Sequence, residues 1–86
     1  MFEKFEYQVC RVQFSRVTFV NGSWQGTIKP TEASQDRAMG TCPYVWDYLQ
    51  QAGQDGWELV AALDHSFEGN NWQVLFLKRK RRDAHE

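Results

Sequence analysis

Residues 44–63, with the sequence YVWDYLQQAGQDGWELVAAL, decide the fold because they predict one helix followed directly by one strand. At 100° per residue, the apolar side chains of the first half share one helix face. They are Val45, Leu49, Ala52 and Gly53, with Trp46 and Tyr48 at the margins. The opposite face carries only polar residues, which are Asp47, Gln50, Gln51 and Gln54. An amphipathic helix is therefore expected near residues 43–54.

Both ends of this helix carry recognisable signals. Pro43 suits the first turn, where a missing N–H leaves no helical hydrogen bond unmade. The Thr41 hydroxyl is a plausible N-cap. Gly53 or Gly56 is expected to end the helix, because glycine adopts the left-handed conformation without strain. The apolar period then changes to two, and residues 57–64 predict a strand with Trp57, Leu59, Ala61 and Leu63 on one face.

The first third of the chain predicts three strands. Residues 5–14 form the first, in which Phe5, Tyr7 and Val9 share one face while Cys10, Val12 and Phe14 share the other. The apolar side changes along this strand, so we expect either a bulge or a strand that serves two environments. Asn21-Gly22 lies between residues 17–20 and 23–25 and predicts a two-residue hairpin turn, since both positions need positive φ. The strand after this turn is expected to end near Ile28.

Two further segments read as connections. Residues 29–42 are polar and have no period, which predicts a long surface loop. Residues 67–71 are rich in turn formers and precede the last strand, residues 72–79.

This last strand is apolar on both faces. Trp72, Val74 and Phe76 alternate with Leu75 and Leu77. One helix covers only one face of a sheet, so something else must cover the other face. The candidates are the Asn21-Gly22 hairpin folded over it and a second copy of the protein. Symmetric dimers are the commonest oligomers, and we therefore expect these five residues to lie at an interface with a second copy.

The composition predicts one small domain. The 86 residues include four Trp, six Phe and three Tyr, and these rings supply a core for residues 1–80. Trp24, beside the hairpin turn, is expected to be the most exposed tryptophan. The predicted class is α+β: an antiparallel sheet of four or five strands with one helix on one face. Residues 81–86 form a basic and polar tail.

The sequence lacks the marks of export or membrane insertion. No apolar run approaches the ~20 residues of a membrane helix, and the N-terminus does not resemble a signal peptide. We therefore expect a cytoplasmic protein without a membrane partner. Cys10 and Cys42 have no metal-type spacing, and both are expected to be free thiols.

Positive charge is concentrated at the end of the chain. Residues 1–77 have a net charge of −4, with five Lys or Arg and nine Asp or Glu, whereas residues 78–86 have a net charge of +3, with five and two. The cluster comprises Lys78, Arg79, Lys80, Arg81 and Arg82. It suggests an alternative function as an accessory nucleic-acid binder, with bases stacked on Tyr7 or Trp72. The competing interpretation is that the charges keep an apolar strand soluble, and the acidic body favours it.

The sequence contains few candidates for chemistry. Cys42 precedes the predicted helix, whose N-terminus can lower the pKa of a thiol, so Cys42 is a candidate reactive cysteine. Asp64, His65 and Glu68 lie near a strand end, but their irregular spacing fits a polar turn better than a metal site. Phosphate-loop, nucleophile-elbow and zinc-site motifs are absent from the sequence. We therefore expect no catalytic residues, no metal and no cofactor.

Three pieces of the chain resemble a known family. They are Phe5-Glu-Tyr-x-Val9, the run Leu49-x-x-x-Gly53-x-x-Gly56-Trp57-Glu58-Leu59-Val60-Ala61, and Phe76-x-Lys78-Arg79. Together they are similar to domain-of-unknown-function family 4177, a group of small bacterial proteins, over residues 3–12 and about 44–80. The resemblance implies a small α+β fold with an antiparallel sheet, and it implies no reaction. The sequence thus favours a non-enzymatic association module that binds itself first and an unknown protein partner second.

Overall fold

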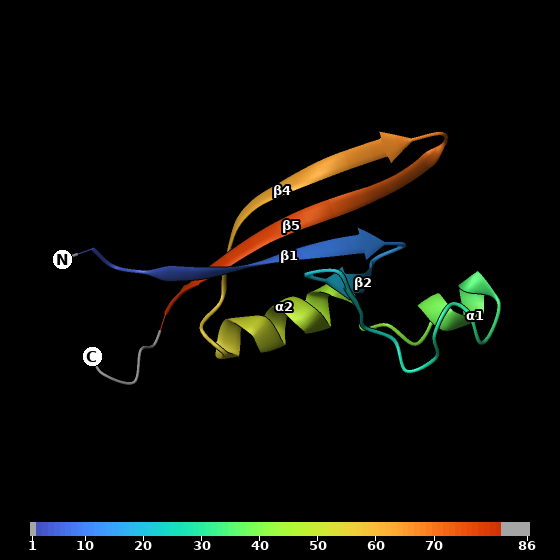
Figure 1. Cartoon of the computed structure of the whole chain (residues 1–86), viewed down its shortest axis with the longest axis horizontal. Helices are drawn as coiled ribbons and strands as arrows, with labels where there is room; N and C mark the ends of the chain where they lie inside the picture. Colours follow the sequence, from blue (N-terminus) through green and yellow to red (C-terminus); the bar gives the residue numbers. More distant parts are fainter. Residues whose placement is uncertain (1, 82–86) are drawn as a thin grey trace.

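The computed structural model describes residues 2–81 as a five-stranded antiparallel sheet with two helices (Figure 1). The strands are β1 (Phe5–Gln13), β2 (Arg16–Val20), β3 (Ser23–Trp24), β4 (Glu58–Phe67) and β5 (Asn70–Lys80), and the helices are α1 (Gln35–Met39) and α2 (Val45–Gln54). The spatial order is β3-β2-β1-β5-β4. The predicted α+β class and the antiparallel sheet are confirmed.

Helix α2 packs its apolar face against the sheet. Val45, Tyr48 and Leu49 contact the core and Ala52 belongs to it, while the predicted polar face is exposed. One residue of the predicted apolar face and one at its margin differ from the prediction. Gly53 is exposed, and Trp46 lies outside the core with its ring stacked on that of Tyr44 at 4.6 Å between centroids. Trp46, and not the half-buried Trp24, is therefore the exposed tryptophan.

The two ends of α2 differ in how well the sequence predicted them. The N-cap is Tyr44, without a side-chain cap, so the assignment of Thr41 was wrong. The Thr41 hydroxyl instead donates to the Ala38 carbonyl at 2.6 Å, because the chain turns once more before the helix begins. At the other end Gly56 has φ +90°, and the Trp57 N–H donates to the Ala52 carbonyl at 3.0 Å. The predicted glycine stop is thus confirmed at Gly56.

The hairpin turn is as expected, but its second arm is short. Asn21 and Gly22 have φ values of 49° and 82°, as a two-residue turn of this type requires. Strand β3 ends at Trp24 and not near Ile28. The reason is local, since the Trp24 indole N–H donates to the Ile28 carbonyl at 2.9 Å and the chain turns away from β2.

The predicted loop at residues 29–42 contains helix α1. Ser34 caps it by accepting a hydrogen bond from the Arg37 N–H at 3.3 Å, and Ala38 and Met39 are buried. Five helical residues span little more than one turn, so they carry no detectable period. The sequence could not reveal this helix by pattern alone.

Bulges shift the registers of the longer strands. The β1–β2 pairing shifts its register between Arg11 and Val12, and the extra residue, Thr18, belongs to β2. Strand β1 itself pairs with β5 without a shift, so the expected bulge in β1 is not found and the strand instead serves two environments, one on each face. An unexpected bulge interrupts β4 between Leu59 and Ala61. Leu59 therefore pairs with Leu77 on the helix side of the sheet, whereas Ala61 and Leu63 pair with residues of the opposite side. The prediction of one common face for residues 57–63 was wrong for this reason.

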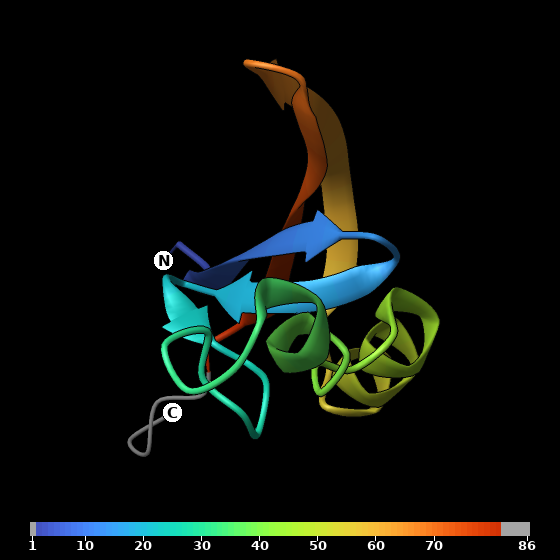
Figure 2. The ribbon, with the colours of Figure 1, turned by 90° about the vertical axis from the view of Figure 1, so that its right-hand side faces the viewer.

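The two faces of the sheet have different surroundings. On the face toward α2 lie the buried side chains of Cys10, Val12, Leu75 and Leu77. We call the other side the open face. From the strand registers, its residues on the three long strands are Phe5, Tyr7, Val9 and Arg11 of β1, Asn70, Trp72, Val74, Phe76, Lys78 and Lys80 of β5, and Glu58, Ala61, Leu63, His65 and Phe67 of β4. No described helix covers this face (Figure 2).

The β4–β5 hairpin forms a projecting arm. Figure 2 shows it rising from the layer of β1 and β2, away from α2. All ten residues of β4 are exposed, and the turn at the tip is Glu68-Gly69 with φ values of 49° and 81°. Strand β4 extends through Phe67 and so beyond the predicted end at Asp64. The part of the arm beyond the pairing of β5 with β1, which ends at Gln73, lies outside the core, where an isolated hairpin gains little stability.

Candidate association surface

The open face is apolar and accessible in the single chain. Tyr7 is 61% exposed, Leu63 is 57% exposed and Phe67 is 61% exposed, and Phe5 and Val9 are also among the exposed large side chains. These five residues come from β1 and β4, with half-buried Trp72, Val74 and Phe76 of β5 between them. They therefore form a continuous surface across three adjacent strands.

Leu75 and Leu77 do not belong to this surface. Both were expected at the interface, but they are buried beneath α2, and Leu77 is only 1% exposed. The expectation was wrong for these two because alternate residues of a strand point to opposite faces. Trp72, Val74 and Phe76 do lie on the open face.

A row of rings and one cation crosses the open face from β3 to β4. The rings of Trp24 and Phe19 meet edge to face at 5.3 Å, and those of Trp72 and His65 stack at 4.5 Å. Between the two pairs lies Arg11, whose guanidinium carbon is 5.2 Å from the ring centroids of both Phe19 and Trp72. Each contact links neighbouring strands, so this row stiffens the surface.

The same surface is hollowed beside the first hairpin. The hollow has a volume of about 550 Å³. Its lining consists of Val9, Arg11, Phe19, Asn21, Gly22 and Val74. These side chains are mainly apolar and offer one cation, which gives shape to the surface without a catalytic group.

The polar groups beneath α2 are buried and hydrogen-bonded. The Cys10 thiol donates to the Gln8 side-chain oxygen at 3.4 Å, and the Tyr48 hydroxyl donates to the same oxygen. Burial raises the pKa of the Cys10 thiol and also that of the Tyr48 hydroxyl. Both groups therefore stay protonated at neutral pH, which suits a structural network better than a nucleophile.

Cys42 is buried, whereas a reactive thiol needs an accessible site that lowers its pKa. This burial raises the pKa of the Cys42 thiol, while nearby Arg16 lowers it to a smaller extent. The Arg16 guanidinium also donates to the Cys42 carbonyl at 2.9 Å. A buried thiol with a raised pKa reacts slowly, so the expected effect of the helix N-terminus is not present.

Three cations at the chain end, Lys78, Arg79 and Lys80, pair with acidic residues. The Lys78 ammonium lies 3.6 Å from the Glu58 carboxylate and 4.7 Å from the Phe5 ring centroid. Lys80 pairs with Glu3 at 3.1 Å. The Arg81 N–H donates to the Lys4 carbonyl at 2.8 Å, and Arg82 lies outside the described residues. These pairs reduce the positive charge that a phosphate would meet.

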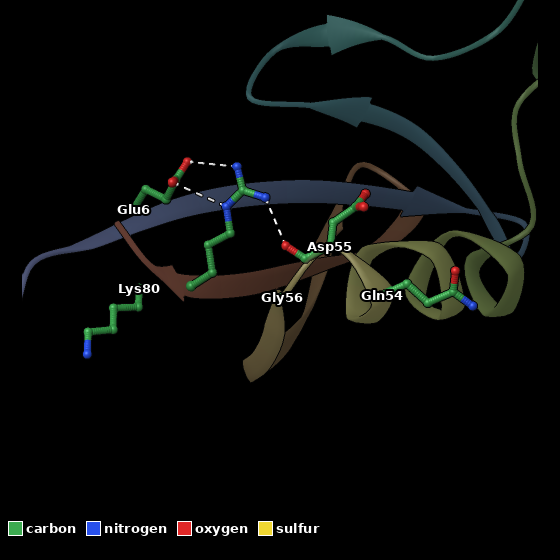
Figure 3. Close-up of a pocket in the computed structure, with 6 residues that line it drawn as sticks. Glu6, Gln54, Asp55, Gly56 and Lys80 are labelled. Atoms are coloured by element: carbon green, nitrogen blue, oxygen red, sulfur yellow. Dashed lines mark hydrogen bonds and ion pairs between the residues drawn. The ribbon is translucent and has the colours of Figure 1, made fainter. Parts of the chain in front are cut away.

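Arg79 of β5 links Glu6 of β1 with Asp55 at the end of α2. Glu6 and Asp55 are labelled in Figure 3. The Arg79 guanidinium donates to the Asp55 carbonyl at 2.9 Å, pairs with Glu6 at 3.2 Å and lies 4.4 Å from the Trp57 ring centroid. A hollow of about 570 Å³ borders it, lined by Glu6, Gln54, Asp55, Gly56, Arg79 and Lys80. Since the charges here pair with one another, the main role of Arg79 is structural. We call it a clamp, because it caps the end of α2 at Asp55 and holds Glu6 of β1.

The polar residues of the arm do not converge. Asp64 pairs with Gln73 and His65 with Trp72, so their side chains lie on opposite faces, while Glu68 is in the turn. Among residues 2–81, no group of three His, Cys, Asp or Glu could hold a metal ion. The polar-turn interpretation fits Glu68, whereas Asp64 and His65 belong to the lengthened strand.

Comparisons with known proteins add no relative. No family model, curated protein or solved structure matches the chain. The resemblance to family 4177 thus stays a prediction. Within the described part of the chain, no helix has the length and apolarity of a membrane span.

Several residues of the open face could not be identified as site residues from the sequence. Val9, Arg11, Leu63 and Phe67 come from strands that are far apart in sequence, and only the register brings them together. The common side of Phe5, Tyr7 and Val9 was visible in the sequence. What the sequence could not show was that this side lies away from the helix.

Proposed function

We propose that this protein is a non-enzymatic association module that binds a second copy of itself through the open face. The observation that carries the proposal is the continuous apolar surface of β1, β5 and β4, which no described element covers. A sheet of this kind is normally covered on both faces, because apolar area in water is unfavourable.

The uncovered area supports an interface. Phe5, Tyr7, Val9, Leu63 and Phe67 are exposed to between about a third and three-fifths of their surface. At roughly 200 Å² for each large side chain, they leave on the order of 500 Å² in contact with water. Patches of this size mark interaction sites, and a standard interface needs about 800 Å² from each partner. The half-buried side chains between them supply part of the rest.

The charge of the surface favours a second copy over a charged partner. Its three cations are already engaged: Lys78 with Glu58, Lys80 with Glu3, and Arg11 with two aromatic rings. The surface is therefore close to neutral and apolar. A two-fold axis places two such faces against each other without an unpaired charge, and two packed sheets lie about 10 Å apart.

Light scattering at tens of micromolar tests this proposal. The chain mass is 10.1 kDa, and the wild type is expected to have the mass of two or more chains. Tyr7→Glu adds a charge to the centre of the open face and is expected to lower the mass. Phe14→Glu is the matched control, because Phe14 is 82% exposed in the β1–β2 turn, outside the open face. A wild-type monomer, or an unchanged mass for Tyr7→Glu, contradicts the proposal.

One observation favours a second candidate, the binding of single-stranded nucleic acid. Arg11 between Phe19 and Trp72 resembles a platform on which bases stack. The acidic partners of Lys78, Arg79 and Lys80 weigh against it. Fluorescence anisotropy with labelled oligouridine and oligothymidine separates the two candidates. Salt-dependent binding that is lost in Arg11→Ala supports the second candidate, whereas its absence at low salt dismisses it.

A further inference from the structure

The outer edge of β4 is a second unpartnered feature of the sheet. Strand β4 is the last in the strand order, and β5 is its one neighbour in the sheet. Its ten residues are all exposed. An edge strand presents a row of unpaired N–H and C=O groups, which readily pair with another strand.

The two edges of the sheet are not equally protected. At the other edge, β3 is only two residues long, which limits pairing. Strand β4 contains no lysine, arginine or proline, and its run Leu59–Leu63 carries no charge. Its protective features are the bulge between Leu59 and Ala61 and the charges of Glu58 and Asp64, whereas the stretch from Ala61 to Phe67 keeps a regular register with β5.

We propose that β4 pairs with β4 of a second copy, antiparallel and around a two-fold axis at Ala62. The two sheets then join into one sheet of about ten strands. This contact is additional to the open-face contact, since a two-fold axis normal to the sheet leaves both open faces uncovered on the same side. Both contacts together predict an assembly of four chains.

The choice of Ala62 follows from face and charge. Directly opposed residues of an antiparallel pair share a face, and Ala61 and Leu63 both lie on the open face. With the axis at Ala62, Ala61 of one copy lies opposite Leu63 of the other. Beyond the bulge the axis also opposes Glu58 to His65, so no acidic side chain meets another. The small side chain of Ala62 itself allows two copies to approach closely.

A charge exchange at Ala62 tests the pairing. Ala62→Lys and Ala62→Glu each place like charges together on the axis, so each variant alone is expected to have half the wild-type mass by light scattering. An equimolar mixture of the two is expected to recover the wild-type mass. A merely unfolded variant would not be rescued by its counterpart. An unchanged mass for either variant, or no recovery in the mixture, overturns the proposal.

Crosslinking locates the axis and separates this proposal from the previous one. Under mild oxidation, Ala62→Cys is expected to form a disulfide with its own copy, whereas Ser66→Cys is not, because its two copies would lie about 26 Å apart. The native thiols are buried and do not interfere. The double variant Tyr7→Glu/Ala62→Cys should still form this disulfide, because Tyr7 lies outside the edge contact. If Tyr7→Glu lowers the mass and Ala62→Cys does not crosslink, the edge contact is refuted and the open-face contact stands; the reverse outcome refutes only the open-face contact.

Discussion

Replacement of Arg79 tests whether the basic chain end has a structural role. Its guanidinium makes three contacts: the hydrogen bond to the Asp55 carbonyl, the ion pair with Glu6 and the stacking on Trp57. With the side chain 35% exposed, the charged hydrogen bond contributes about 1 kcal/mol, and the ion pair and the stacking contribute about 0.5 kcal/mol each. Arg79→Ala is therefore expected to lower the free energy of unfolding by about 2 kcal/mol.

Urea unfolding at one fixed protein concentration measures this loss. With an m-value of about 1 kcal/mol per molar urea for a chain of this size, the midpoint falls by about 2 M. Arg79→Lys keeps the charge and loses the planar fork, so it should recover less than half of the loss.

Lys80→Ala is the matched control. The side chains of Lys80 and Glu3 are 68% and 62% exposed, and such a pair contributes little, so the change should stay within about 0.5 kcal/mol. If Arg79→Ala is as stable as Lys80→Ala, the clamp described above does not exist. The basic cluster would then be better explained by a ligand.

Three further predictions concern the core, the helix end and pH. Leu77→Ala is expected to lower the free energy of unfolding by about 3 kcal/mol in urea, because Leu77 is 1% exposed at the centre of the core; a loss below about 1 kcal/mol would contradict its placement. Gly56→Ala should cost about 1–2 kcal/mol, since φ is +90° with open space around it, whereas Gly53→Ala, also in open space but helical, should not destabilise. Because burial raises the pKa of Cys10 above 9.0, the unfolded thiol loses its proton first, so stability should fall as pH rises above about 9. Urea midpoints at pH 7.5, 9 and 10 measure this fall, which Cys10→Ala should reduce and a flat profile would refute.

Much of the fold could be predicted because its signals are local. The apolar spacing of Val45, Leu49 and Ala52 reports a helix at any position in a structure, and Asn21-Gly22 specifies a turn through its own dihedral angles. Helix α1 was not predictable, since five residues show no period and gain stability only when Ala38 and Met39 are buried.

The candidate surface was predictable in part. An apolar last strand required cover on both faces, and Trp72, Val74 and Phe76 do lie away from α2. The bulge at Val60 could not be foreseen. It places Leu59 and Leu63, which were expected on one face, on opposite faces of the sheet. The acid partners of the basic cluster were equally hidden, since Glu3 and Glu6 belong to the other end of the chain.

The sequence by itself determined the elements of this protein: one long amphipathic helix, its glycine end, a tight hairpin and a closing strand with two apolar faces. Each depends on dihedral preferences and side-chain period within about ten residues. Only the tertiary structure decided the strand order, the registers, the burial of Leu75 and Leu77 and the exposure of Tyr7, Leu63 and Phe67. These depend on the pairing of residues as far apart in the sequence as Phe5 and Lys80, and a one-residue shift in such a pairing exchanges the buried and exposed faces of a strand.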